Sequence, residues 1–547
     1  MSKATTAVIP AAGLGLRMLP ISGKMPKAMI PVDGKPIISW ILNKLIQQGI
    51  QEYVIVVGEK KEILIDYINR IYRDRAKITF VTQENLTGPL SAIALAQGDI
   101  RTKDQLIILG DTIVFDELTF DKSWVLYHPV NDYWRWCLVE TRENQIIRFL
   151  DKPDSAVSTD KALVGVYYLE SNELWQKSIN KVLSSDKRVK NEFQLSSALE
   201  LYNQEIPITA RFCEHWYDCG SIDNYYKTRG ELLNVRSFNN VEVDTTVGTL
   251  LKKSKRRGKL IDEINWFLEL PKECQILTPR ILDYSTELNE PYVKFEYYGY
   301  QTLSELFLFE NVHGKVWQSI LARLFSVIHG YWHSKETHHE SARENTFSMY
   351  WEKTLARISD VNLPDLEEDI CINGNHFSGW RTLADRVKKA CRAMSENVSW
   401  SIVHGDLCFP NILFDVETGL FRFIDPRGKF GNMRGIYGDK RYDISKLYHS
   451  VHGKYDFVIN DLFDVKQGDA KNHWQLTLFS SAQHDEVETV LRKLILGSGF
   501  HLGEILCIEG LLFLSMIPLH NDFPKRQLAF WLIGMQILNE ALEEMGQ

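Results

Sequence analysis

The chain lacks the sequence features of a secreted protein, of a protein with structural zinc sites, or of a membrane protein. None of its eight cysteines stands in the C-x-x-C spacing that structural zinc or thioredoxin-like redox sites require. We interpret them as buried or incidental thiols in a reducing compartment. The N-terminus runs into an apolar strand-like segment without a signal-peptide core, and no later stretch looks apolar for long enough to span a bilayer. We therefore expect a cytoplasmic protein without membrane insertion.

An excess of positive charge is also missing. The 63 Lys and Arg residues are outnumbered by 71 Asp and Glu residues, which gives a net charge of -8. A general polyanion-binding surface, and with it nucleic acid as a partner, is therefore not expected. The sequence shows no internal repeat, low-complexity tract or Pro/Gly-rich linker. It leaves open whether the chain forms a homo-oligomer.

At 547 residues the chain exceeds the size at which a single hydrophobic core keeps growing. The pattern of apolar and polar residues changes near residue 235, and this change predicts two domains, 1–235 and 236–547. In the first, short apolar runs alternate with amphipathic stretches, which is typical of a mostly parallel α/β sheet of Rossmann-like type. The clearest strands are Ala7–Ala11, Tyr53–Val57, Ile78–Val81 and Leu106–Leu109, with helices at Ile37–Gln48 and Leu90–Ala96. Such βαβ connections gather loops at the carboxyl edge of the sheet.

The second domain begins with a small β-rich lobe, 236–300, and continues as a helical lobe, 301–547. Short β-type runs at Val241–Val243, Gly248–Leu251 and Tyr292–Tyr298 surround one helix near Leu260–Leu268. Farther along, apolar residues recur at helical spacing and predict one buried helix face. They are Val316, Trp317, Ile320, Leu321, Leu324, Phe325 and Ile328. The domain is therefore expected to be bilobal and α+β.

A glycine-rich segment leaves the first strand and precedes two cations. Glycine lets a backbone approach a triphosphate closely and direct N–H groups at it. We predict NTP binding by Ala11, Ala12, Gly13 and Gly15. Arg17 and Lys27 would supply positive charge to the phosphates. A tight strand-to-helix turn without a ligand is the alternative for the glycines alone.

The run from Val8 to Pro36 resembles the signature of the sugar-nucleotide pyrophosphorylases. Leu16 departs from that family, which has Thr or Ser there. The resemblance continues with Gln83 and Gly88, which correspond to the segment that recognises the base. It implies that an acceptor phosphate attacks the α-phosphate of an NTP, with CTP or UTP expected, and that pyrophosphate leaves.

Four further residues match this family. Asp111, in Leu-Gly-Asp at a strand end, and Asp218, in Trp-Tyr-Asp-Cys-Gly, resemble its two Mg²⁺ ligands. Two carboxylates on one Mg²⁺ would offset charge that the cations cannot neutralise alone. Lys152 and Glu192 match positions that hold the phosphate and hydroxyls of the acceptor.

The second domain contains the spacing of a kinase catalytic loop, with Asp406 five residues before Asn411. Asp406 would accept the proton of a substrate hydroxyl, and Asn411 would ligate Mg²⁺. Asp425 follows after a short strand pair as a second metal ligand. Its neighbour Pro426, in place of the Phe of Asp-Phe-Gly, points away from protein kinases.

This segment resembles the aminoglycoside phosphotransferase and choline kinase superfamily, and the run 438–447 extends the match, with Asp443 in a structural role. The resemblance implies a protein-kinase-like bilobal fold with a helical C-lobe, and Mg²⁺ and ATP as ligands. An ATP lysine should pair with a helix glutamate, for which we choose Lys252 and Glu263. Lys253 is the rival, because strand register cannot be derived from sequence.

The small lobe has no G-x-G-x-x-G loop, so residues such as Thr245 and Thr246 would cover the phosphates. The segment 295–298 would meet adenine.

Together the resemblances imply a bifunctional enzyme that acts on small molecules. One half would phosphorylate a hydroxyl of a sugar or polyol, and the other would couple that phosphate to a nucleotide, for a surface polysaccharide. Two alternatives stay open. One is an amino alcohol activated as its CDP derivative, and the other is a kinase-like half that only regulates or binds.

Overall fold

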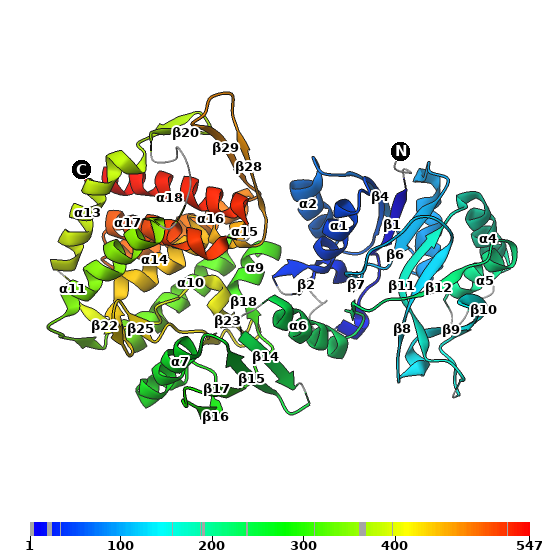
Figure 1. The fold of residues 1–547 in the computed structure, drawn as a ribbon, viewed down its shortest axis with the longest axis horizontal. Helices are drawn as coiled ribbons and strands as arrows, with labels where there is room; N and C mark the ends of the chain where they lie inside the picture. The colour runs from blue at the N-terminus through cyan, green and yellow to red at the C-terminus, as the bar shows by residue number, and fades with distance from the viewer. Residues whose placement is uncertain are drawn as a thin grey trace. The chain divides into compact units, whose positions relative to one another are not determined.

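The computed structural model describes the chain except residues 1–4, 19–24, 33, 156, 186–187, 189–191, 237–238, 245, 311, 360, 362–367, 397, 522 and 547. Its contacts divide it into two compact units, residues 1–232 and 233–547 (Figure 1). Each unit has its own buried apolar core.

The N-terminal unit is built on a sheet that has nine strands within the described residues, in the order β5-β4-β1-β6-β11-β8-β12-β10-β9. The strands are β1 (Thr6–Pro10), β4 (Glu52–Val57), β5 (Lys77–Thr82), β6 (Gln105–Ile108), β8 (Trp124–Pro129), β9 (Cys137–Arg142), β10 (Gln145–Asp151), β11 (Lys161–Leu169) and β12 (Thr209–Phe212). The four strands predicted from the sequence lie side by side and are parallel.

The expectation of a mostly parallel sheet is wrong for the half of the sheet formed by β11, β8, β12, β10 and β9. There, β12 is parallel to β8, but β11, β10 and β9 pair antiparallel to their neighbours. One cause is the two-residue connection between β9 and β10. Glu143 and Asn144 both have positive φ, 50° and 67°, which is the geometry of a tight hairpin turn, and such a turn joins only antiparallel strands.

Helices and two small two-stranded ladders accompany this sheet. The helices are α1 (Ile37–Gln47), α2 (Lys61–Tyr72), α3 (Pro89–Ala96), α4 (Asn172–Ser184), α5 (Leu195–Glu205) and α6 (Ile222–Arg236). The ladders pair β2 (Pro31–Val32) with β3 (Lys35–Pro36), and β7 (Thr112–Val114) with β13 (Trp216–Asp218). In the second ladder Asp218 lies opposite Thr112, so two distant segments meet at the carboxyl edge of β6.

The C-terminal unit starts with an antiparallel sheet ordered β14-β15-β17-β16. Its strands are β14 (Asn239–Asp244), β15 (Thr249–Ser254), β16 (Ile281–Ser285) and β17 (Tyr292–Glu296), with α7 (Arg257–Glu269) between β15 and β16. The predicted strands and helix are present here, and β16 is an addition.

Helices dominate the rest of this unit. They are α8 (Lys272–Gln275), α9 (Leu303–Phe309), α10 (Gly314–Ile328), α11 (Ala342–Phe347), α12 (Lys353–Ser359), α13 (Trp380–Glu396), α14 (Lys440–Val451), α15 (Tyr455–Ile459), α16 (Ala482–Gly497), α17 (Leu502–Met516) and α18 (Pro524–Glu544). The apolar face predicted over α10 is buried except for Val316, which is 49% exposed.

Short strands connect these helices. They form the sheets β18-β23-β24, β19-β22-β27, β21-β20-β29-β28 and β25-β26. Their bounds are β18 (Gln301–Thr302), β19 (Glu336–Thr337), β20 (Ile370–Ile372), β21 (Asn375–Phe377), β22 (Trp400–Ile402), β23 (Ile412–Phe414), β24 (Phe421–Phe423), β25 (Lys429–Phe430), β26 (Met433–Arg434), β27 (Tyr437–Asp439), β28 (Phe463–Gln467) and β29 (His473–Leu478).

We expected no stretch that is apolar for long enough to span a bilayer, and this expectation is wrong: one helical stretch has the required length and composition. The stretch Leu502–His520, which contains α17, passes that test, and 78% of its apolar window is buried inside the fold. In the structure α17 packs against α14 and α18 (Figure 1). It also carries Glu509, which is fully buried and pairs with His452 at 3.0 Å. The apolar face of α17 is thus covered by neighbouring helices.

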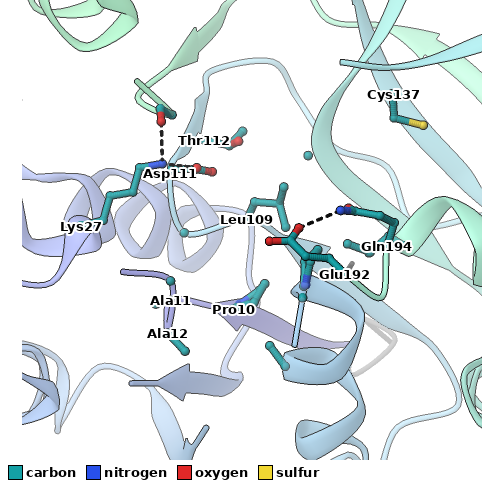
Figure 2. Close-up of a pocket in the computed structure, with 18 of the residues that line it drawn as sticks. Pro10, Ala11, Ala12, Lys27, Leu109, Asp111, Thr112, Cys137, Glu192 and Gln194 are labelled. Atoms are coloured by element: carbon teal, nitrogen blue, oxygen red, sulfur yellow. Dashed lines mark hydrogen bonds and ion pairs between the residues drawn. The ribbon is translucent and has the colours of Figure 1, made fainter. Parts of the chain in front are cut away.

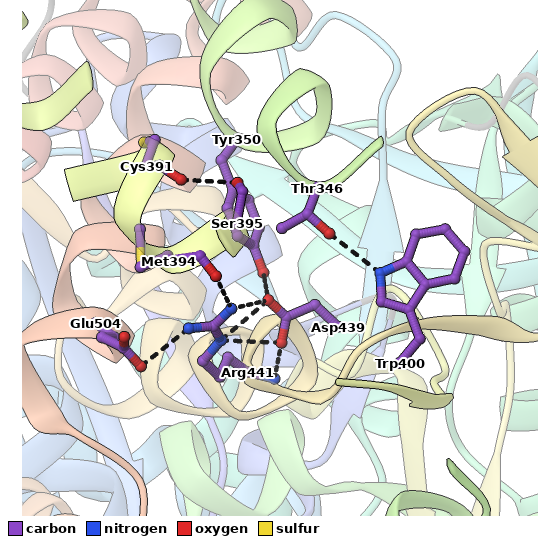
Figure 3. A network of polar contacts seen from close by, with 9 residues as sticks. All are labelled: Thr346, Tyr350, Cys391, Met394, Ser395, Trp400, Asp439, Arg441 and Glu504. Carbon is purple, nitrogen blue, oxygen red and sulfur yellow. Dashed lines mark hydrogen bonds and ion pairs between the residues drawn. The ribbon is translucent and has the colours of Figure 1, made fainter. Parts of the chain in front are cut away.

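A buried ion pair holds the start of α14 (Figure 3). The Arg441 guanidinium donates to both carboxylate oxygens of Asp439, with distances of 2.7 to 3.0 Å, and to the carbonyl oxygen of Met394 at 2.7 Å. Its Nη1 lies 3.0 Å from a Glu504 carboxylate oxygen, and Tyr350 donates its hydroxyl to Asp439. Burial lowers the pKa of Arg441, but Asp439 outweighs it and raises the pKa above its ordinary value.

Substituting Arg441→Met would leave the Asp439 carboxylate buried without its counter-ion. We expect a loss of about 3–5 kcal/mol in the free energy of unfolding, the usual cost of breaking a buried pair. Urea unfolding followed by circular dichroism measures it. Lys335→Met, which removes an exposed pair with Glu273, is the matched control and should leave the curve unchanged. Equal shifts for both variants would contradict the role given to Arg441.

Candidate functional sites

A cavity of about 700 Å³ opens at the carboxyl edge of the parallel strands in the N-terminal unit (Figure 2). Every residue predicted for this site lines it: Ala11, Ala12, Gly13, Gly15, Arg17, Lys27, Gln83, Gly88, Asp111, Lys152, Glu192 and Asp218. Residues 19–24 and 33 of the signature run lie outside the described residues. The motifs, up to 200 residues apart, therefore share one pocket.

Lys27 and Asp111 form an ion pair in this cavity (Figure 2). The Nζ atom of Lys27 lies 2.5 Å from Asp111 Oδ2 and also donates to the carbonyl oxygen of Gly220 at 3.2 Å. Burial raises the pKa of Asp111, but Lys27, with a contribution from Arg17, brings it below its ordinary value. Asp111 is therefore a carboxylate at neutral pH.

Asp218 reaches the same place from β13. Its Oδ1 accepts the Gly220 N–H at 3.0 Å, and its Oδ2 accepts a short hydrogen bond from the Asn224 amide. Burial and the charge of Asp111 raise the pKa of Asp218. Two neighbouring carboxylates that repel each other are an oxygen donor set suited to a divalent cation. The residues present therefore fit Mg²⁺, which Asp111 and Asp218 would hold.

Gln83 and Gly88, the residues that the family resemblance assigns to recognition of the base, also line the cavity. Gln83 is buried and donates its amide to the carbonyl oxygen of Asn85 at 3.2 Å. Gly88 has φ 122°, and a Cβ there would lie 2.7 Å from the Phe193 backbone nitrogen and oxygen. Only glycine suits this backbone, which brings the loop before α3 against the segment after Glu192.

The same cavity is lined by Lys152 and Glu192, the predicted acceptor residues, and Glu192 lies beside Gly88. Glu192 accepts a hydrogen bond from the Gln194 amide at 2.8 Å (Figure 2). Lys152 has φ 46°, and its N–H donates to the carbonyl oxygen of Trp136 at 2.9 Å. The cavity lining also includes residues that the sequence did not mark: Arg135, Trp136, Tyr167, Gln194 and Ser196. They belong to no recognised motif and meet only through the fold.

Within the C-terminal unit, the segment around Asp406 is fixed by Asp443. The Asp443 carboxylate is fully buried and accepts the N–H groups of His404 and Gly405, each at 2.8 Å. Gly405 has φ 77°, and a Cβ there would lie 2.8 Å from Cβ of Arg427. The backbone before Asp406 therefore has a single well-defined course.

Asp406 itself pairs with a lysine of α14. Lys446 Nζ lies 2.9 Å from Asp406 Oδ1, and 43% of the Asp406 side chain is exposed. Burial raises the pKa of Asp406, but Lys446 and Arg427 outweigh it and bring the pKa to about 2. The Asn411 amide donates to the Asp406 carbonyl oxygen at 2.8 Å, which leaves its own oxygen as the atom for a cation.

Lys252 and Glu263 of the small sheet lobe come together with Asp425, which follows β24. Lys252 Nζ contacts both Glu263 oxygens at 2.8 Å and Asp425 Oδ1 at 2.7 Å. Burial lowers the pKa of Lys252, but Asp425 and Glu263 raise it above its ordinary value. The rival Lys253 is exposed on the other face of β15.

The remaining expectations for this lobe concern its phosphate and adenine contacts. Thr245 lies outside the described residues, and the N–H of Thr246 donates to Asp244. Of the segment 295–298, Phe295 is buried and Tyr298 contacts Arg422. Asn411 and Asp425 offer oxygen atoms from a carboxamide and a carboxylate, a donor set that fits Mg²⁺.

Removing a carboxylate should weaken cation binding in the N-terminal cavity. Asp218→Asn lowers the ligand charge, so we expect the affinity for Mn²⁺, used as a probe for Mg²⁺, to fall roughly tenfold or more. Electron paramagnetic resonance of free Mn²⁺ measures it. Glu117→Gln, an exposed carboxylate paired with Lys44, is the control and should bind as the parent does. Unchanged affinity in Asp218→Asn would remove that residue from the cation site.

Comparison with known proteins covers the first unit. A model of the nucleotidyl transferase family matches residues 6–234. The bifunctional protein GlmU of Methanococcus maripaludis is 33% identical over 171 residues, which cover 30% of this chain and 40% of GlmU. A UTP–glucose-1-phosphate uridylyltransferase of Staphylococcus haemolyticus is 27% identical over 269 residues, 42% of this chain and 92% of the relative. The chain thus spans less than half of GlmU.

Among solved structures, UDP-glucose pyrophosphorylase complexed with UDP-glucose aligns with a TM-score of 0.38 and 24% identity, over 43% of this chain and all of that one. The family match has the same extent as the unit that contains the cavity, the ion pair and the two carboxylates. The N-terminal part of the chain, residues 6–234, is a nucleotidyltransferase domain.

Proposed function

We propose that the chain is a bifunctional enzyme that makes a nucleotide-activated small molecule in two steps. The C-terminal unit would transfer the γ-phosphate of ATP to a hydroxyl, and the N-terminal domain would couple that phosphate to CTP or UTP and release pyrophosphate. The observation that carries the first step is the pairing of Lys252 with Glu263 and Asp425 beside a fixed loop that presents Asp406. This set combines a phosphate cation, metal ligands and a base, as phosphoryl transfer requires.

Phosphoryl transfer would use the ionised Asp406 as the base. Its pKa of about 2 keeps the carboxylate charged at neutral pH, so it orients the acceptor hydroxyl and takes its proton as the oxygen attacks phosphorus. Lys252 would hold the ATP phosphates, and Asn411 and Asp425 would hold Mg²⁺. When bound, Mg²⁺ offsets the negative charge that builds up on the transferred group.

Nucleotidyl transfer needs no protein nucleophile, because the phosphate of the acceptor attacks the α-phosphate itself. The chain would supply position and charge. Arg17 and Lys27 face the triphosphate, and the glycine-rich loop offers its N–H groups. Lys152 and Glu192, which line the same cavity, would hold the acceptor. The ion pair with Lys27 keeps the Asp111 carboxylate ionised and holds both side chains in place.

The acceptor of the first step would be a sugar or polyol. Relatives of the N-terminal domain are named for glucose 1-phosphate, and this supports a sugar-type acceptor phosphate for the second step. A product of this kind is a donor for surface polysaccharide synthesis. Both units would work in the cytoplasm, where ATP and the second nucleotide are available.

Two single substitutions should separate the steps. Asp406→Asn should reduce ATP-dependent phosphorylation about 10²- to 10⁴-fold, because the base is lost. It should leave pyrophosphate release from a supplied sugar phosphate unchanged. Asp111→Asn should do the reverse, with pyrophosphate release falling about 10²-fold or more. Product analysis by mass spectrometry with ATP, CTP and UTP measures both, and loss of both activities in either folded variant would refute the two-site proposal.

Lys446 should determine how the phosphorylation rate depends on pH at acidic pH. In the parent, Asp406 stays ionised from about pH 4 to 6, so its protonation does not slow the reaction there. In Lys446→Met the largest of the charges that lower the pKa of Asp406 is gone, Arg427 remains, and burial still raises the pKa, so the acid limb of the rate should move up towards that range. The pH profile of kcat measures it. Lys440→Met, on the same helix but paired with Glu336, is the control; the same limb in both variants would contradict this role.

A further inference from the structure

Beside Asp406 the C-terminal unit gathers more positive charge than phosphoryl transfer from ATP requires. Arg427 comes first: its N–H donates to the His404 carbonyl oxygen at 2.9 Å, and its side chain lies against Gly405. Its Nη1 donates to the Tyr442 hydroxyl at 3.0 Å. A guanidinium is thereby held next to the base.

Two more cations come from α12. Lys353 Nζ lies 5.7 Å from the centre of the Tyr442 ring and 3.5 Å from the Met349 sulfur. Arg357, one turn farther along, donates Nη1 to the carbonyl oxygen of Ser515 at 2.8 Å. Both side chains are partly buried. Tyr442 contacts both Lys353 and Arg427, and Arg357 lies near enough to Arg427 and Tyr442 for their charges to act on it, so the three cations are neighbours.

The positive charge of this cluster is not neutralised within the protein. Among the described residues, Lys353, Arg357 and Arg427 form no ion pair within 4 Å, and the nearby Asp406 is already paired with Lys446. Burial, together with the charges of Arg427 and Arg357, lowers the pKa of Lys353 well below its ordinary value. Like charges gathered away from water are unfavourable unless an anion joins them. The cluster is therefore a place for an anionic group.

The ATP phosphates are not the natural occupant of the α12 part of this cluster. The cation that serves the ATP group is Lys252, which contacts Glu263 and Asp425. Lys353 is influenced by Asp406 and Lys446 instead. Asp406 is the residue that receives the acceptor hydroxyl, so charge beside it acts on the acceptor.

We propose that the acceptor phosphorylated by the C-terminal unit already carries a carboxylate or a phosphate, which Lys353 and Arg357 bind while its hydroxyl is directed to Asp406. This inference rests on the proposed function. In the reaction the hydroxyl oxygen forms a bond to the γ-phosphorus, the bond from that phosphorus to the β,γ-bridging oxygen breaks, ADP leaves, and the proton passes to Asp406. The proposal narrows the sugar or polyol to an acidic one and disfavours a cationic amino alcohol.

The test compares acceptors of different charge with the full-length protein, ATP and Mg²⁺, and follows ADP release. Glycerate, gluconate and glucuronate represent carboxylates, and glycerol 3-phosphate and glucose 6-phosphate represent phosphates. Glycerol and glucose are neutral, and choline and ethanolamine are cationic. We expect turnover with an anionic acceptor and roughly tenfold or lower efficiency with its neutral counterpart. The carboxylate and phosphate arms identify which anion is used.

Substitutions then tie the preference to α12. Lys353→Met or Arg357→Met should raise KM for the anionic acceptor about 10- to 100-fold and leave KM for ATP unchanged. Lys388→Met is the matched control, because Lys388 is exposed and its Nζ lies 5.9 Å from the Trp351 ring centre. It should change neither constant. A rise in KM for ATP alone would assign the cluster to the nucleotide and overturn the proposal.

Two outcomes separate this proposal from the one on which it rests. Turnover of a neutral or cationic acceptor, with all anions inert, would overturn the anionic acceptor and leave the kinase activity standing. If no acceptor is phosphorylated, the proposed kinase activity is refuted. Calorimetry with the same anions then tests separately whether the cluster binds an anion. Binding that Lys353→Met weakens and Lys388→Met does not would support the anion site, and absence of binding would refute it.

Discussion

Charged groups withdrawn from water must be paired, and this constraint shapes both units. In the nucleotidyltransferase domain the pairing is between Lys27 and Asp111, which belong to segments more than eighty residues apart. In the C-terminal unit Lys252, on strand β15, pairs with Glu263 of helix α7 and with Asp425. In each case the ion pair joins segments that are distant in the sequence, at the place where we propose that phosphate groups bind. The cluster beside Asp406 departs from this rule, and that departure is why it is informative about the acceptor.

Much of the N-terminal site could be predicted because its motifs follow strands. Residues at the carboxyl ends of parallel strands meet whatever the details of the sheet, so the glycine-rich segment after β1 could be placed at that edge from the strand pattern, whereas the role of Asp111 came from the family resemblance. Asp218 needed the family resemblance, since the ladder of β7 with β13 has no sequence signal of its own. The antiparallel half of the sheet was missed, because the turn at Glu143 and Asn144 lacks the glycine that usually marks a tight hairpin.

The C-terminal unit shows where sequence reasoning stops. The spacing of Asp406 and Asn411 predicts a catalytic loop. The choice between Lys252 and Lys253 depends on which face of β15 is buried, and only the structure supplies that. Lys353 and Arg357 lie about fifty residues before the loop on a helix with no motif. Their nearness to Asp406 is a product of helix packing, and no local pattern could have announced it.

The buried carboxylate of Asp443 has a consequence for motion. Because it is fully buried and holds the amides of His404 and Gly405, those hydrogen bonds can open only when α14 leaves its place in the core. The segment that presents Asp406 thus belongs to the slowest-exchanging part of the unit rather than to its fluctuating surface. Its geometry is set during folding and does not wait for a ligand, so whatever rearrangement accompanies turnover must come from other segments.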